Sequence, residues 1–206
     1  LAKICCKSRL LELMHDFVLF DGGIKKLPRV HQYFGIKAAQ THVQQRRGGI
    51  IWHTQGSGKS ILMVLLARWI LENKPAARVA IITDRDELDV QIERVFTEAG
   101  EAIQRSQSGR DLMAQLAQPN PRLLCSLVHK FGRRDVDDFE AFIRELAAQP
   151  SQTQGEIYVF VDECHRTQGG KLHRLMKAMM PNAVFIGFTG TPLLKQDAQT
   201  SLEVFG

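Results

Sequence analysis

The sequence contains no apolar run long enough to cross a membrane. A membrane span needs roughly 18 to 20 consecutive apolar residues, and no stretch approaches that length. The N-terminus LAKICCKSRL also lacks the apolar core and cleavage site of a secretory signal. Internal repeats, low-complexity blocks and a linker long enough to separate two domains are likewise missing. We therefore expect one globular domain that has no contact with a membrane.

Cysteine is scarce and badly placed for structural bonds. The four cysteines are Cys5, Cys6, Cys125 and Cys164. The adjacent pair at the N-terminus is a poor candidate for a disulfide, and no CxxC or Cys/His cluster suggests a metal site. A reducing, cytoplasmic compartment fits this cysteine usage best.

The composition is that of an ordinary soluble domain. The 206 residues are 44% hydrophobic and 24% charged, with a net charge of +5. This length allows one sizeable core. The basic balance is compatible with a polyanionic partner but does not by itself indicate one. Because the chain begins at Leu rather than Met, we expect a piece of a longer protein.

Short, uninterrupted apolar runs alternate with helical patterns along most of the chain. Such runs are typical of strands that are buried on both faces of a parallel sheet. The runs span residues 49–52, 79–83, 123–127, 157–161 and 183–188, and the helical patterns span residues 30–47, 59–71, 87–99, 136–148 and 171–180. Residues 10–20 suggest a helix or a helix and strand that end in a turn at 21–23, and residues 150–155 suggest a loop. This order predicts an α/β domain with right-handed crossovers.

The segment His53 to Ser60, HTQGSGKS, follows the first predicted strand and opens a predicted helix. The strict phosphate-loop pattern requires glycine where this chain has His53. Gly56 and Gly58 nevertheless allow backbone N–H groups to face a phosphate, and Lys59 supplies a charge for the β- and γ-phosphates. Ser60 offers a hydroxyl to Mg²⁺. A glycine-rich turn that merely caps a helix is the competing interpretation.

Two further strand ends carry polar groups. The run 157–161 ends in Asp162 and Glu163, where an acidic pair could hold Mg²⁺ and orient the attacking water. A polar strand end would be the better interpretation of an isolated pair. Because this pair follows a phosphate loop by about a hundred residues, coincidence is a poor explanation. The next run is followed by Thr189, Gly190 and Thr191, and the hydroxyls of Thr189 and Thr191 could relay between the nucleotide and a bound strand. A common turn is the alternative interpretation of this segment.

With these motifs in place, the chain resembles the first RecA-like motor domain of superfamily 2 helicases and translocases. More narrowly, it is similar to the restriction (HsdR) subunit of type I restriction enzymes over about residues 10–194. The segments that carry this resemblance are FVLFD, RVHQYF, WHTQGSGKS, ITDRDELDVQ, VDECHRTQGG and FIGFTGTPL. The resemblance implies a three-layer α-β-α RecA-like P-loop NTPase domain with a mainly parallel central sheet. It places the motor at residues 29–206, preceded by a linking segment at residues 1–28.

The resemblance implies ATP and Mg²⁺ as cofactors and assigns the site residues. Lys59, Asp162 and Glu163 would be catalytic, and Ser60 with Asp162 would hold Mg²⁺. Gln32 would hydrogen-bond the adenine edge, although an exposed glutamine at a helix start is the alternative. The full set expected to contact the nucleotide is Gln32, Thr54, Gln55, Gly56, Ser57, Gly58, Lys59 and Ser60.

The resemblance also implies contacts for DNA and for coupling. Arg85 would contact the nucleic-acid backbone, but an ion pair with its acidic neighbours is nearly as plausible. Lys130 lies in a basic group that acidic residues follow, so simple solvation is the alternative. His165, Thr189, Gly190 and Thr191 would couple nucleotide state to DNA, although a histidine near a strand end is more often a packed hydrogen-bonding group.

The expected function is the ATP-binding half of a double-stranded DNA translocase. The resemblance implies the methyltransferase and specificity subunits of a type I restriction complex as partners. Neither a second motor domain nor the nuclease constellation of that family is found in the 206 residues. The alternatives are a DExH-type RNA helicase domain and a P-loop protein that acts as a nucleotide-dependent binding module or small-molecule kinase.

Overall fold

A computed structural model describes most of the chain. It covers residues 6–21, 23–54, 56–83, 92–94, 96–97, 100, 102–107, 109–127, 153–162 and 176–190. Among these residues, no helix combines the length and the apolar composition that crossing a bilayer requires. The predicted helix at 136–148 lies outside the described residues. The predicted helices at 87–99 and 171–180 are described in part, and residues 92–94, 96–97 and 176–179 are helical.

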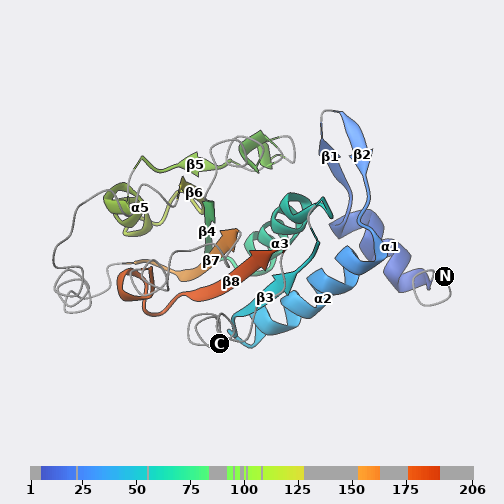
Figure 1. Ribbon diagram of the computed structural model, residues 1–206, viewed down its shortest axis with the longest axis horizontal. Helices are drawn as coiled ribbons and strands as arrows, with labels where there is room; N and C mark the ends of the chain where they lie inside the picture. Colours follow the sequence, from blue (N-terminus) through green and yellow to red (C-terminus); the bar gives the residue numbers. More distant parts are fainter. Residues whose placement is uncertain are drawn as a thin grey trace.

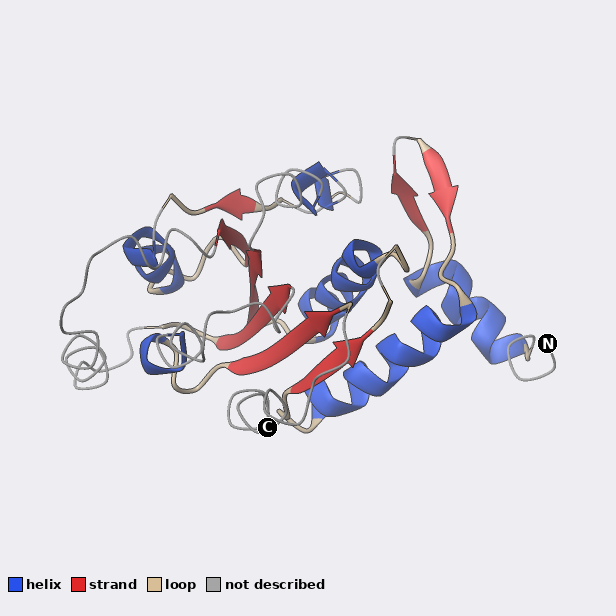
Figure 2. Ribbon diagram, in the orientation of Figure 1, coloured by secondary structure: helices blue, strands red, loops and turns tan. Residues whose placement is uncertain are grey.

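A six-stranded sheet forms the centre of the domain, and every pair of neighbouring strands in it is parallel (Figures 1 and 2). The spatial order is β3-β8-β7-β4-β6-β5. The strands are β3 (Gly49–Trp52), β4 (Ala77–Thr83), β5 (Gln104–Arg105), β6 (Leu123–Leu127), β7 (Glu156–Asp162) and β8 (Val184–Thr189). All five predicted strands are confirmed, and every residue of β4 and β8 is buried, as expected for strands covered on both faces.

Helices cover both faces of this sheet, so the domain has the predicted three layers. Side chains of β4 alternate between two cores, with Val79 and Ile81 in one and Ala80 and Ile82 in the other. The first core contains α2 (Val30–Gln44) and α3 (Lys59–Asn73). The second contains α5 (Gly109–Leu116) and the helical residues near Met176. Figure 1 shows α2 and α3 on one side of the sheet and α5 on the other.

An N-terminal unit precedes the sheet. It consists of α1 (Lys7–Asp16) and an antiparallel hairpin of β1 (Leu19–Asp21) and β2 (Ile24–Lys26). The predicted helix-and-strand element and its turn are therefore confirmed, and Gly23 in the turn has a φ of 75°. Phe17 and Leu19 are buried in the first core. The hairpin stands beside α1, away from the main sheet (Figure 1).

The strands β2 and β5 and the helix α5 were not predicted, and none of the three has a strong sequence signal. β5 has only two residues, both polar and exposed, so no apolar run marks it. α5 has eight residues and buries Leu112 and Leu116, one helical turn apart. One pair of apolar residues does not establish a helical periodicity, so the sequence does not distinguish a helix from a loop at this segment.

Two arginines, the buried Arg78 and the half-buried Arg122, brace the end of the sheet where the strands begin. Arg78 is only 2% exposed, and its guanidinium donates to the carbonyl oxygens of Gln115, Leu116 and Pro121 at 2.6 to 3.2 Å. These contacts cap the C-terminal end of α5 with a cation. Burial lowers the pKa of Arg78 from its ordinary value. Arg122 donates in the same way to three carbonyl oxygens at the end of α3 and the start of β4.

A glycine permits the close approach of two chain segments at the same end. Gly155 has a φ of 82°, and a Cβ atom built on it would lie 2.3 Å from the carbonyl oxygen of Ala76. That oxygen accepts a hydrogen bond of 2.9 Å from the Glu156 N–H. Only glycine combines this backbone conformation with this approach.

Candidate nucleotide-binding site

The loop between β3 and α3 has the backbone geometry of an anion cradle. Gly56 and Gly58 have φ values of 74° and 80°, and Gly58 is the N-cap of α3. In this left-handed conformation the chain turns sharply into the helix, where backbone N–H groups and the helix dipole favour a negative charge. Lys59 is the first residue of α3 and Ser60 is the second. The side chains predicted to bind phosphate, Lys59, and Mg²⁺, Ser60, therefore stand at a helix N-terminus.

Hydrogen bonds from three directions hold the loop in place. The His53 N–H donates to the carbonyl oxygen of Thr189 at 3.0 Å, which ties the loop to the end of β8. The Ser57 N–H donates to the carbonyl oxygen of Thr54 at 3.1 Å. The amide of Gln32, from α2, donates to the carbonyl oxygen of Ser57 at 2.5 Å. The loop is thus fastened to a strand, to itself and to a neighbouring helix.

The side chain of Gln32 connects the start of α2 to the loop between β3 and α3. Its Oε1 accepts a hydrogen bond of 2.7 Å from the Arg29 N–H and so caps the first turn of α2. Its Nε2 contacts the loop, and a Cβ atom built on Gly58 would lie 2.8 Å from it. Gln32 is 4% exposed. One N–H and one lone pair of the amide remain for a ligand, so the predicted adenine contact stays a prediction.

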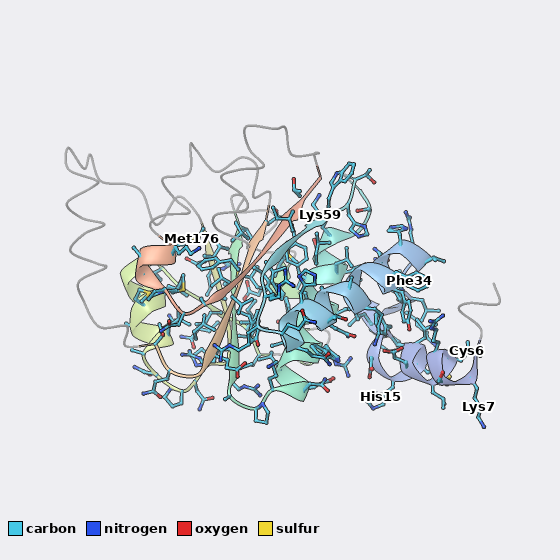
Figure 3. All side chains as sticks on the ribbon, turned by 90° about the horizontal axis from the view of Figure 1, so that it is seen from below. Cys6, Lys7, His15, Phe34, Lys59 and Met176 are labelled. Carbon is cyan, nitrogen blue, oxygen red and sulfur yellow. The ribbon has the colours of Figure 1, made fainter. Side chains whose placement is uncertain are left out.

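Asp162 and Thr189 lie at the same edge of the sheet as the loop. They end β7 and β8 and are 1% and 0% exposed. Because the order is β3-β8-β7, the end of β7 is two strand spacings, about 10 Å, from the end of β3. Figure 3 shows Lys59 beside the ends of the strands. Parallel pairing therefore brings together residues that lie about a hundred positions apart.

Six predicted site residues lie outside the described residues. They are Gln55, Arg85, Glu163, His165, Thr191 and Lys130. Gly190 is described and directly follows β8 at the edge of the sheet. The remaining predicted residues all lie on α2, on the loop, at the start of α3 or at the ends of β7 and β8.

His53 has an unusual electrostatic environment. Its ring lies 5.1 Å from the ring of His31 between centroids, at an interplanar angle of 37°. A Cβ atom built on Gly35 would lie 3.0 Å from its Nε2, so α2 packs closely against the ring. Burial lowers the pKa of His53, and the positive charges of His31 and Lys59 lower it further. The neutral imidazole is therefore favoured.

Two hydroxyl groups at this edge carried no role in the sequence analysis. Within the described part of the chain, Thr83 Oγ1 and Ser126 Oγ are buried and have no hydrogen-bond partner. Thr83 follows Ile82, whose register partner is Val161, so Thr83 is level with Asp162. The signal that could have marked them is a hydroxyl residue in an apolar run, in the last position for Thr83 and in the last but one for Ser126. Buried hydroxyls at the ligand edge of an α/β sheet are available to a bound group.

The donor chemistry of the site suits a hard cation bound together with an anion. No group of three or more His, Cys, Asp or Glu side chains that could hold a metal occurs among the residues with described positions. The hydroxyl of Ser60 and the carboxylate of Asp162 are oxygen donors, which Mg²⁺ prefers. Mg²⁺ is usually bound by one or two such groups together with substrate phosphates.

Comparison with known proteins identifies the family. The family model for SWI2/SNF2 ATPases matches residues 31–206. The chain belongs to the SWI2/SNF2 ATPase family. Nucleotide use follows from this membership.

Curated relatives of this ATPase domain are type I restriction enzyme subunits. The HindI endonuclease subunit of Haemophilus influenzae is 32% identical over 96% of the chain and 21% of its own length. A provisionally named type I enzyme, the MjaIXP endonuclease subunit of Methanocaldococcus jannaschii, is 31% identical over 97% of the chain and 19% of its own length. The SauCOLORF180P endonuclease subunit of Staphylococcus aureus is 30% identical over 86% of the chain and 19% of its own length. The chain spans about a fifth of the length of these relatives.

Solved structures share the fold. The UvsW helicase of bacteriophage T4 superposes with a TM-score of 0.61 at 18% identity, over 98% of this chain and 66% of that one. The SWI2/SNF2 ATPase core of Sulfolobus solfataricus, solved in complex with dsDNA, has a TM-score of 0.65 at 13% identity, over 94% of this chain and 38% of that one. At these identities the likeness concerns the fold, and it confirms the predicted RecA-like architecture.

Proposed function

We propose that this domain is the ATP-binding half of an ATP-driven double-stranded DNA translocase, in the restriction subunit of a type I restriction enzyme. The observation that carries the proposal is the adjacency of the phosphate loop and Asp162 at one edge of a parallel sheet. The identity to type I endonuclease subunits over nearly the whole chain supports the narrower assignment.

We assign the residues of the loop and of its surroundings the following tasks in ATP binding. The backbone N–H groups that follow Gly56 and Gly58 would cradle the phosphates, and Lys59 would neutralise charge on the β- and γ-phosphates. Thr54, Gln55 and Ser57 would complete the loop around them. Ser60 and Asp162 would hold Mg²⁺, which supplies charge neutralisation for the leaving and attacking oxygens.

Hydrolysis requires a group that orients water, and we assign that role to Glu163. Its position in the sequence supports the assignment, since it directly follows Asp162, the last residue of β7. The hydrogen bond from the His53 N–H to the Thr189 carbonyl oxygen supports a coupling role for the segment after β8, because it links the loop directly to that strand. Gly190, Thr191 and His165 would extend this route to the DNA.

Double-stranded DNA is the proposed substrate, with Arg85 and Lys130 as backbone contacts. The Sulfolobus SWI2/SNF2 core that shares the fold was solved with dsDNA, which supports this choice. The methyltransferase and specificity subunits of a type I complex are the proposed partners, in the cytoplasm. We also propose that residues 1–28 link the motor to the rest of the subunit, since the family match begins at residue 31.

The complete subunit carrying Lys59→Ala tests the proposal. Loss of the cation that faces the triphosphate should lower DNA-stimulated ATP hydrolysis about 10²-fold or more. Lys177→Ala is a matched control, because Lys177 is exposed beside Met176, outside the site, and its loss should leave the rate unchanged. The steady-state rate should rise with duplex DNA and not with RNA. Retained turnover in Lys59→Ala would refute the site, and stimulation by RNA alone would indicate an RNA helicase.

A further inference from the structure

Helix α1 exposes its apolar side chains. None of its ten residues is buried, and Leu10, Leu11 and Met14 are 44%, 59% and 71% exposed. At 100° per residue, these three side chains fall within one third of the helix circumference. They form an apolar stripe along one face of α1, which we call the α1 stripe.

The opposite face of α1 is fixed to the domain by polar contacts. Glu12 accepts hydrogen bonds of 2.6 Å from the Tyr33 hydroxyl and from Lys37 Nζ, both on α2. Leu13 packs against the first core. Burial and the hydrogen bond to Glu12 raise the pKa of Tyr33 to about 12. Because Glu12 and Leu13 determine the rotation of the helix about its axis, the α1 stripe is held pointing away from the domain.

This orientation is the reverse of that expected for a surface helix. An amphipathic helix normally turns its apolar face to the core and its charged face to water. All but one of the large hydrophobic side chains exposed on the described residues lie between residues 10 and 34, the exception being Trp52. Such a concentration of exposed apolar side chains marks an interaction surface.

The exposed charges of the N-terminal unit that carries the α1 stripe are mainly basic. Lys7, Lys25 and Arg29 are exposed in the same N-terminal unit. The acidic Glu12 is already paired with Lys37, at 2.6 Å. A complementary surface would therefore have an apolar centre and an acidic rim.

We propose that the α1 stripe is the docking surface for another domain of the same, longer polypeptide, with an apolar centre and an acidic rim. The relatives match 96–97% of this chain but are about five times longer, so most of each polypeptide lies outside the aligned part. The matched part includes most or all of α1.

The size of the α1 stripe favours a domain of the same chain over a separate molecule. Three side chains cannot supply the roughly 800 Å² per partner that a stable complex between separate molecules buries. A covalently connected domain needs a smaller contact, because its effective concentration is in the millimolar range. The occupant is therefore identified by connectivity and charge.

Oxidative footprinting of the complete polypeptide tests the proposal. Met14 is 71% exposed on this domain, whereas Met63 is 0% exposed and serves as the protected reference. Hydrogen peroxide is the oxidant, and peptide mass spectrometry measures the oxidation of each methionine. At every protein concentration, Met14 should oxidise at least tenfold more slowly than a methionine that is exposed to solvent. Fast oxidation of Met14 would overturn the proposal. Protection that appears only at high concentration would indicate a second copy, and protection that appears only with added subunits would indicate a separate partner; either would overturn it.

A charge placed in the α1 stripe should open the contact. Leu11→Glu should raise the oxidation rate of Met14 at least tenfold, while Met63 stays protected and so reports an intact core. Ser8→Glu is the matched control, because it adds the same charge to the same helix on an exposed position outside the α1 stripe. Equal rates for Met14 in the two variants would contradict the proposal, as would protection in Leu11→Glu that matches the unaltered polypeptide.

Discussion

Replacing Gln32 by alanine should loosen the phosphate loop and weaken binding of any triphosphate, with or without a base. The side chain donates to the Ser57 carbonyl oxygen at 2.5 Å and accepts from the Arg29 N–H at 2.7 Å, and it is 4% exposed. Alanine removes both contacts. The loop then loses its hydrogen bond to α2, although the hydrogen bond from the His53 N–H to β8 remains.

The expected losses of stability and of triphosphate affinity follow from the two hydrogen bonds that alanine removes. A buried carbonyl oxygen left without its donor costs about 1–3 kcal/mol. Loss of a helix cap costs about 1 kcal/mol. The free energy of unfolding should therefore fall by about 2–4 kcal/mol. Only the first part acts on the loop, and it corresponds to a loss of about 5- to 150-fold in triphosphate affinity.

The assay measures ATP and inorganic tripolyphosphate in parallel on the complete subunit. Displacement of a fluorescent nucleotide gives both dissociation constants, and urea unfolding gives stability. Gln40→Ala is the matched control, since Gln40 lies on the same helix and is also 4% exposed. It should lower stability and leave both affinities unchanged.

The two ligands separate the loop contact from the predicted base contact. A loss shared by tripolyphosphate measures the support of the loop, and any additional loss for ATP measures recognition of adenine. Gln32→Glu should bind both ligands more weakly than Gln32→Ala, because a carboxylate cannot donate to the Ser57 carbonyl oxygen and repels phosphate. Unchanged binding of tripolyphosphate by Gln32→Ala would refute the reasoning.

Three further predictions concern stability, each measured by urea unfolding followed by circular dichroism. Arg78→Met should lower the free energy of unfolding by about 3 kcal/mol or more, because three carbonyl oxygens lose a charged donor; a loss under about 1 kcal/mol would contradict this. Gly155→Ala should lower the free energy of unfolding by at least about 1 kcal/mol more than Gly100→Ala. Both positions have positive φ, but only at Gly155 would the added methyl group clash with a backbone oxygen. Equal losses in the two variants would contradict this. His53→Asn should lose less stability than the unaltered protein when the pH falls below 6.5. Burial and neighbouring positive charges lower the pKa of His53 in the folded protein, so the unfolded chain binds the proton first and is favoured by acid. Parallel pH profiles for the two proteins would contradict this.

The strands and the phosphate loop could be predicted because their signals are local. Short apolar runs predicted β3 and β6 with the bounds that the structure has. The expected burial on both faces is wrong for β3, because this strand lies at the edge of the sheet and none of its residues is buried. The loop was recognisable despite His53, because the positions that require positive φ are Gly56 and Gly58. Residues 104–116 were missed because β5 is polar and α5 buries a single helical turn.

The contacts that assemble the site could not be predicted, because each joins distant segments. The hydrogen bond between Gln32 and Ser57 spans 25 positions, and no periodicity in either segment specifies it. The close packing of His53 against Gly35 is visible only when α2 lies beside the loop. The rotation of α1 depends on where Tyr33 and Lys37 place the partner groups for Glu12.

The sequence by itself determined which segments become strands and helices and which residue types could bind a triphosphate, because hydrophobic periodicity and glycine conformation act over a few residues. Only the tertiary structure decided that β8 lies between β3 and β7, which brings the loop and Asp162 to one edge. It also decided that α1 turns its apolar face outward. Strand order and helix rotation result from packing among segments tens of residues apart, and that packing leaves no periodic trace in any one of them.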